Sequence, residues 1–411
     1  MFWSTASVPN GESASLTIKA TKRRSKIVKV KKLIVVSFFL VFIIYLVASP
    51  GDTPYDYFTR LSHSFLQGKY WLEENPSWLS ELIPIANNKF FVVYPPMPAI
   101  LLIPFVYIFG KSFPQQYLAH FLGAMLVVLT MRLSYLIKKD KQMALWSGIL
   151  VGLGSIIFYL SSVGSVWYLG QITAAFFLMA ALVESLERKR LIVISIFLGA
   201  AYLSRPHTML SLPLYMFLVR KKLPNIKSYL KLGLPFLAFF AFDSIYNFAR
   251  FGVPWNKGYF LIPGTLDEPW FSKGIVHPSY ILEDLKVAFL MGPKFLRHFP
   301  YLQPSWAGMA IWITTPAFIF ALKAPIKEMV VKISWLSIFL IFLVVGVHGG
   351  TGFAQFGYRF AVDFYPFLIF LTLKGISQTK LKSIHWILLL IGIIVNLWGV
   401  IWINKFGWVS Y

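Results

Sequence analysis

Long apolar runs, separated by short clusters of lysine and arginine, recur along the chain after residue 32, and this pattern constrains the fold most strongly. An α-helix needs about 20 mostly apolar residues to cross the roughly 30 Å hydrocarbon core of a bilayer. Charged residues make up only 13% of the chain, whereas soluble domains contain about 25%. We therefore predict an all-α protein, a polytopic transmembrane helical bundle with about 11–12 membrane segments.

The candidate membrane segments define a transmembrane domain over residues 33–403. It lies between a basic N-terminal tail, 1–32, and a short C-terminal tail, 404–411. The first apolar run is long and lacks a small-residue cleavage pattern, so it is predicted to be an anchor rather than a cleaved signal. The candidate segments are 33–48, 97–110, 116–137, 143–160, 169–184, 191–204, 207–219, 229–249, 304–322, 333–347, 360–374 and 384–402.

The positive charge of the chain indicates membrane orientation rather than nucleic-acid binding. The net charge is +23, but lysine and arginine concentrate in short loops, as expected on the cytoplasmic side of a membrane protein. We predict no nucleic-acid partner and an integral, multi-pass protein of the bacterial inner (plasma) membrane with a cytoplasmic N-terminus. Three loops are then external, at about 49–93, 250–303 and 348–359.

One conflict affects this topology. If every run is a full crossing, the basic cluster at 138–141 and all later basic loops lie outside, against the positive-inside rule. A short or re-entrant element between residues 97 and 160 restores them to the cytoplasm. We assign that role to 97–110, because this run is short and bounded by prolines.

The first external loop carries the first candidate catalytic residues. Asp52 and Asp56 follow the first span directly, in a chain with only 16 acidic residues. A partly desolvated carboxylate at the membrane interface has a raised pKa and can accept a proton from a hydroxyl. The alternative is that Asp52 only caps a helix. Residues 56–68 are predicted to form a surface helix with Tyr57, Leu61 and Phe65 on one face.

Two arginines are the candidates for binding a phosphate. Arg205 lies between two spans, followed by Pro206 and His207, and an arginine at membrane depth is a functional candidate by default. Arg359 lies four residues before Asp363, so on a helix the two could pair on one face. The planar donor fork of a guanidinium matches phosphate oxygens, although a snorkelling arginine or a simple surface pair would give the same pattern.

The chain offers no support for several other kinds of site. It contains no cysteine, which excludes disulfides, thiolate metal sites and cysteine nucleophiles. No metal-ligand spacing surrounds His207, and no cofactor is predicted. Aromatic residues in the long loops could stack on sugar rings, but interfacial aromatic belts have the same composition.

Blocks of residues spread over nearly the whole chain resemble the GT-C superfamily of polyprenyl-phosphate-sugar-dependent glycosyltransferases, in particular the protein-mannosyltransferase and aminoarabinose-transferase type. The matching residues run Tyr57 to Gly68-Lys69, Asn75-Pro76, Glu81-Leu82, Tyr94-Pro95-Pro96-Met97-Pro98, Tyr246-Asn247, Arg250-Phe251-Gly252, Gly258-Tyr259, Gly308, Thr315-Pro316 and Phe356-Gly357-Tyr358-Arg359-Phe360 with Asp363 and Pro366.

The resemblance implies a GT-C-like fold with a helical first external loop, and inverting transfer of a sugar from a polyprenyl-phosphate donor at the outer face of the membrane. The acceptor would be a protein, a glycolipid or a polysaccharide. In the family the general base is an aspartate of the first external loop, which matches Asp52, with Asp56 as the rival. The donor phosphate would bind Arg205, His207 and Arg359. Loop residues that could contact substrate are Tyr57, Tyr94, Arg250, Tyr259, Tyr358 and Asp363.

One departure from the family pattern keeps two questions open. Members often have an acidic residue directly after the aspartate, whereas this chain has Thr53. Asp56 therefore remains an alternative base, and a divalent metal is not predicted. Two other functions also fit a polytopic chain with intramembrane arginines: a transporter or flippase of lipid-linked sugars, and a non-catalytic membrane subunit. No internal repeat of the kind expected for a transporter is evident.

Overall fold

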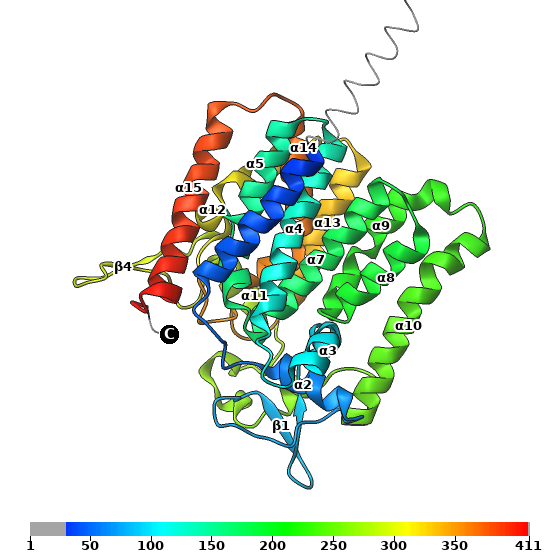
Figure 1. Ribbon diagram of the computed structural model, residues 1–411, viewed down its shortest axis with the longest axis vertical. Coiled ribbons are helices and arrows are strands. Elements are labelled where there is room, and N and C mark those ends of the chain that lie inside the picture. Colours follow the sequence, from blue (N-terminus) through cyan, green and yellow to red (C-terminus); the bar gives the residue numbers. More distant parts are fainter. Residues whose placement is uncertain (1–29, 410–411) are drawn as a thin grey trace, which may run out of the picture.

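The computed structural model describes residues 30–409 and is a helical bundle with a cap of loops at one end, here called the loop end (Figure 1). Seven of the described helices are long and apolar enough to cross a membrane. The protein is an integral, multi-pass membrane protein, and the predicted all-α fold class is confirmed. Most of the predicted N-terminal tail lies outside the described residues.

The long helices form the body of the bundle. They are the first helix (Val30–Ala48), α4 (Gln116–Ile137), α7 (Val166–Leu186), α10 (Ile226–Phe251), α13 (Met329–Gly346), α14 (Tyr365–Ser377), which continues the 3₁₀ helix η7 (Arg359–Phe364), and α15 (Ser383–Val400), which ends in a π-helical turn, Ile401–Lys405.

Shorter elements complete the described chain. The short α-helices are α2 (Tyr57–Leu66), α3 (Met97–Phe109), α5 (Lys141–Gly152), α6 (Ile157–Val163), α8 (Leu191–Tyr202), α9 (Leu212–Val219), α11 (Tyr280–Phe289) and α12 (Ile311–Thr314). The 3₁₀ helices are η1 (Pro206–Ser211), η2 (Arg220–Lys222), η3 (Gly258–Phe260), η4 (Thr265–Asp267), η5 (Pro269–Phe271) and η6 (Pro316–Lys323). Two antiparallel hairpins pair β1 (Leu82–Ile85) with β2 (Lys89–Val92) and β3 (Lys294–Phe295) with β4 (Leu302–Gln303).

The core lies around α7 and α14. Both spans are almost entirely buried within the protein, whereas the first helix, α10 and α15 bury only a small share of their surface and face outward. Gly375 of α14 is needed for one close approach, because a Cβ there would collide with the Phe320 carbonyl of η6. Helices that are apolar on an outward face are expected for a bundle in lipid.

Two predicted segments differ in detail from uninterrupted spans. The run 143–160 forms α5 and α6, which are bent by 53° at the break between them. The run 304–322 forms the short α12 and the 3₁₀ helix η6, separated by Thr315 and beginning only at residue 311. Pro316 explains this break, since proline cannot donate the backbone hydrogen bond that would continue α12.

The element 97–110 is short, as predicted. Its helix α3 has 13 residues, which corresponds to about 20 Å at 1.5 Å per residue, less than the roughly 30 Å of the hydrocarbon core. It packs against α2 at the loop end (Figure 1). The predicted helix of the first loop is confirmed as α2, and Tyr57 and Leu61 lie on its buried face.

Candidate functional site

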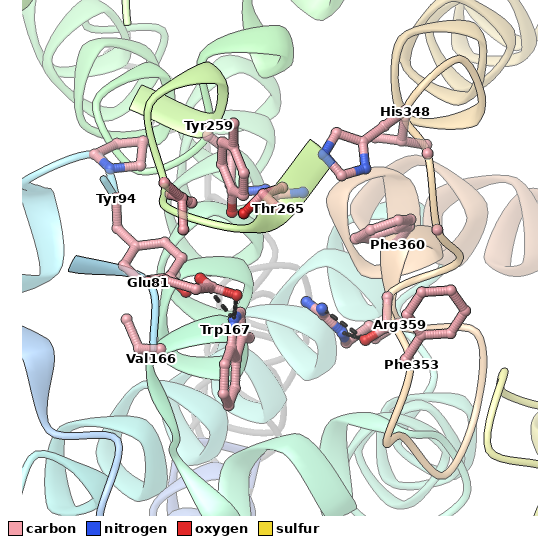
Figure 2. Close-up of a pocket in the computed structure, with 18 of the residues that line it drawn as sticks. Glu81, Tyr94, Val166, Trp167, Tyr259, Thr265, His348, Phe353, Arg359 and Phe360 are labelled. Carbon is pink, nitrogen blue, oxygen red and sulfur yellow. Dashed lines mark hydrogen bonds between the residues drawn. The ribbon is translucent and has the colours of Figure 1, made fainter. Parts of the chain in front are cut away.

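A cavity of about 710 Å³ lies at the loop end, where segments far apart in the sequence meet. The first loop contributes Glu81 and Tyr94, the start of α7 contributes Trp167, and the segment after α8 contributes Arg205. The second long loop adds Tyr259, and the stretch 348–360 closes the wall. Figure 2 shows Glu81 and Trp167 on one side of the cavity and Arg359 on the other. A concave site of this size with a few converging charged groups is the usual form of a small-molecule site.

Two carboxylates line this cavity, Glu81 and Glu268, and Glu268 accepts a hydrogen bond from the neighbouring Trp270 indole N–H at 2.6 Å. Glu81 is held by more distant parts of the chain. It directly precedes β1, and its backbone N–H donates to the Tyr57 hydroxyl at 3.0 Å, which ties it to α2. Both carboxylate oxygens lie 3.3 Å from the Trp167 indole N–H, which donates to them (Figure 2). Glu81 is partly exposed, but to the cavity rather than to the outer surface. Burial raises the pKa of Glu81 to about 7, because removal from bulk water disfavours the charged form.

Arg359 faces Glu81 across the cavity without a carboxylate partner among residues 30–409. Only 7% of the residue is exposed. Its Nε and Nη2 donate to the Gly352 carbonyl oxygen at 3.0 and 2.8 Å. Gly352 has a φ of +93°, and a Cβ at this position would lie 2.9 Å from Arg359 Nε. The glycine therefore allows the loop to approach the guanidinium closely.

Arg205 is held differently. Its Nε and Nη2 donate to Asp363 Oδ2 at 3.1 and 2.8 Å, and His207 Nε2 lies 2.8 Å from the same oxygen. Asp363 is fully buried, so it neutralises Arg205 and fixes both basic side chains at the cavity wall. The pairing of Asp363 with Arg359 that the spacing of four residues allowed is not formed. Both lie in η7, and in a 3₁₀ helix, with three residues per turn, residues four apart do not share a face.

His348 also lines the cavity, although it was not predicted from the sequence as an individual site residue. Its ring lies 5.5 Å from that of Tyr259, edge to face. Burial, with a smaller effect of Arg205, lowers the pKa of His348 to about 4. The imidazole is therefore neutral near pH 7 and adds hydrogen-bonding capacity without further positive charge.

Five of the residues singled out from the sequence line the cavity: Tyr94, Arg205, His207, Tyr259 and Arg359. The structure brings them together from four segments: the first loop, the stretch after α8, the second long loop and the stretch 348–360. The others do not line it: Asp52, Asp56, Tyr57, Arg250, Tyr358 and Asp363.

The two aspartates at the start of the first loop lie outside this wall. Asp52 is exposed and accepts a hydrogen bond from Gln116 Nε2 at 2.6 Å. Asp56 pairs with Arg60 at 2.8 Å. The interpretation of Asp52 as a helix cap is wrong, because α2 begins at Tyr57 and Asp56 occupies the cap position without a side-chain capping bond.

Three of the remaining residues lie outside the cavity and hold the segments that form its wall. Tyr57 holds the backbone of Glu81, as described above. Arg250 donates to the Val92 carbonyl at 2.6 Å and so fastens α10 to β2. The Tyr358 hydroxyl donates to Asp284 of α11 at 2.7 Å, which anchors the chain directly before Arg359. Their effect on substrate would therefore pass through neighbouring residues.

In the sequence, Glu81 stands only within a block that resembles the GT-C superfamily, and no role was predicted for it. A lone glutamate in a polar loop carries no local signal of burial, because the tryptophan and arginine that surround it come from distant segments. Among residues 30–409, no cluster of three or more histidine, aspartate or glutamate side chains could hold a metal ion.

Comparison with solved structures assigns the fold. ArnT from Cupriavidus metallidurans bound to undecaprenyl phosphate superposes with a TM-score of 0.53 at 15% identity, over 88% of this chain and 62% of that one. The chain has the ArnT fold. Apo ArnT gives a TM-score of 0.51 at 12% identity, over 93% of this chain and 66% of ArnT. The GT-C-like fold predicted from the sequence is therefore confirmed.

The chain spans less than two thirds of ArnT, so the likeness covers only part of that protein. A more distant similarity, with a TM-score of 0.48 at 12% identity, links 91% of the chain to 55% of the archaeal oligosaccharyltransferase AglB from Archaeoglobus fulgidus. No family profile and no curated protein matches the sequence.

Proposed function

We propose that this protein is a membrane glycosyltransferase that transfers a sugar from a polyprenyl-phosphate donor to an acceptor hydroxyl at the outer face of the membrane. The observation that carries the proposal is the buried Arg359, which faces a cavity without a carboxylate partner among the described residues. A buried charge without a partner is costly in a stable fold. An anionic ligand would supply the missing charge.

A lipid phosphate fits this requirement. Arg205 and His207 line the same cavity as Arg359, so one phosphate could bind between planar donor groups. The site lies at the end of a bundle of spans, where a polyprenyl tail could enter the bilayer. ArnT, which shares the fold, has been seen bound to undecaprenyl phosphate.

Glu81 is our proposed general base in this cavity, in place of the first-loop aspartates. Its carboxylate accepts the proton of the acceptor hydroxyl, whose oxygen attacks the anomeric carbon of the donor sugar. The bond from this carbon to the phosphate oxygen breaks, and the lipid phosphate leaves with inversion. Arg359 and Arg205 stabilise the charge that develops on the leaving phosphate. A raised pKa near 7 suits a group that exchanges a proton at neutral pH.

The first test is direct transfer by the purified chain in lipid nanodiscs, with undecaprenyl-phosphate sugars as donors. The variant Arg359→Gln should reduce kcat by about 10²–10³, the usual cost of losing one donor to a developing oxyanion. The matched control is Arg220→Gln, because Arg220 is exposed and lies away from the cavity, bonded to the Phe217 carbonyl.

The same experiment separates the competing functions. A chain that moves lipid-linked sugar between leaflets without forming a glycosidic bond would be a transporter or flippase. A chain that neither transfers nor moves the sugar would be a non-catalytic subunit. Either result contradicts the proposed transferase.

A further inference from the structure

The β3–β4 hairpin, residues 293–303, is the most exposed apolar feature of the described loops. Figure 1 shows it projecting sideways from the bundle beside the C-terminal end of α15. Phe295 is 85% exposed, and Phe299 and Tyr301 are 59% and 62% exposed. Exposed aromatic side chains gathered on one projecting hairpin are unfavourable in water and mark an interaction surface.

The hairpin also carries unpaired positive charge. Lys294 and Arg297 are exposed and have no carboxylate partner among residues 30–409. His298 follows directly. Cations interleaved with aromatic rings are typical of segments that lie at the boundary between lipid headgroups and acyl chains, where the rings enter the apolar layer and the cations contact phosphates.

Continuity with a membrane-spanning helix shows which surface the hairpin meets. The Phe299 ring contacts Trp408 edge to face at 4.6 Å, and Trp408 contacts Trp402 at 4.8 Å. Both tryptophans follow α15 in the chain. This span buries only a small share of its surface and exposes Ile387 and Leu390. The apolar outer face of α15 thus continues through the tryptophans onto the hairpin.

The other hairpin gives the contrast. β1–β2 also projects at the loop end (Figure 1), but its turn consists of the exposed Ala86, Asn87 and Asn88, and it points away from the bundle. Its inner residues Val92 and Phe91 are buried against the protein. An exposed hairpin in this fold therefore does not need an apolar tip. The exposed aromatic residues of 293–303 indicate that this hairpin has a binding partner.

We propose that the β3–β4 hairpin inserts its aromatic side chains into the interface of the bilayer leaflet at the loop end, with Lys294 and Arg297 on anionic lipid headgroups. The hairpin is then a second membrane anchor of the loop cap, beyond the spans. This inference goes beyond the proposed function and does not depend on it. The anchor would fix the depth of the loop end relative to the headgroups.

The absence of cysteine allows a clean test. Full-length protein with the single substitution Phe295→Cys carries an NBD fluorophore and is reconstituted in nanodiscs that contain phosphatidylglycerol. Lipids with a nitroxide near the headgroup should quench most of its emission, and aqueous iodide should quench little. The matched control is Asn88→Cys at the turn of β1–β2, which should show the reverse. Both positions are exposed, so neither label disturbs the core.

A second arm tests the charges. The double variant Lys294→Gln, Arg297→Gln should lose the extra lipid quenching that phosphatidylglycerol gives over phosphatidylcholine. High salt should do the same to the parent, since 1 M salt shortens the Debye length from about 10 Å to about 3 Å. Equal quenching in both lipids would overturn the electrostatic contact.

Two outcomes would overturn the insertion itself. Iodide quenching at residue 295 equal to that at residue 88, with no effect of lipid nitroxides, would place the hairpin in water. The label at residue 295 could instead be protected from iodide only when two copies share one nanodisc. This result would show that a second copy of this chain, rather than lipid, covers the hairpin.

Discussion

The first loop places carboxylates in two different environments. At its start, Asp52 is exposed and Asp56 pairs with Arg60. Further along, Glu81 lines the cavity opposite Arg359, and its carboxylate accepts hydrogen bonds from the Trp167 indole N–H. A position close in sequence to the end of a span therefore does not decide which carboxylate can work as a base. Its surroundings in the tertiary structure decide this.

The two environments differ in how the negative charge is neutralised. Arg60 bonds Asp56 at 2.8 Å and Glu74 at 2.6 Å, and Lys111 bonds Glu74 at 2.7 Å. These cations contact one oxygen of Asp56 and both oxygens of Glu74, and they stabilise the charged carboxylates. Glu81 instead lies in a partly desolvated wall, and its pKa rises to about 7. Glu81 thus combines access to the cavity with a carboxylate that has no cationic partner among residues 30–409.

The largest expected effect comes from removing the Glu81 carboxylate. Glu81→Gln keeps the side-chain size but cannot accept the proton, so kcat should fall by about 10²–10⁴. The measurement is sugar transfer by purified variants in nanodiscs. Glu74→Gln, in the same loop but exposed and outside the cavity, is the control and should retain activity. An unchanged kcat for Glu81→Gln would remove this residue from the mechanism.

A smaller effect is expected at Asp363, a buried carboxylate that is already paired. Asp363→Asn weakens the charge-assisted hydrogen bonds to Arg205 and His207, which cost about 1.5–3 kcal/mol each when lost. The KM for the donor should rise about 10- to 100-fold, with a smaller change in kcat. The exposed Asp267→Asn serves as the control. A fall in kcat with an unchanged KM would mean that Asp363 takes part in the chemical step.

The pH dependence should report the same carboxylate. Because the pKa of Glu81 is raised to about 7, the carboxyl is mostly protonated below this pH and cannot act as a base. The rate should rise about tenfold per pH unit below pH 7 and level off above it. The profile of kcat/KM in the parent protein measures this. A plateau that extends down to pH 5 would point instead to a carboxylate of ordinary pKa.

The smallest expected effects are at Asp52 and Asp56. Because they lie outside the cavity and make surface contacts worth at most about 1 kcal/mol, Asp52→Asn and Asp56→Asn should each change kcat less than about fivefold. The same transfer assay checks both. A loss of 10²-fold or more at one of them would restore the first-loop aspartate as the base in place of Glu81.

The sequence by itself determined the class of fold and most of its long elements. Apolar length and proline placement predicted the helices at 116–137 and 229–249 and the short element at 97–110, because a bilayer imposes these features locally along the chain. Periodicity also predicted α2 and its buried face. The break at 153–156 was not predicted, since apolar composition is the same on both sides of the bend. The break in 304–322 was not predicted either, although Pro316 marks it in the sequence.

For the site, the sequence identified the arginines, because a cation at membrane depth stands out from an apolar background. The tertiary structure alone decided how they are used. It paired Arg205 with Asp363, left Arg359 without a carboxylate partner among residues 30–409, and set Glu81 across the cavity beside a tryptophan of α7. Desolvation and unpaired charge depend on residues far apart in the sequence, so no local pattern could have separated Glu81 from Asp52.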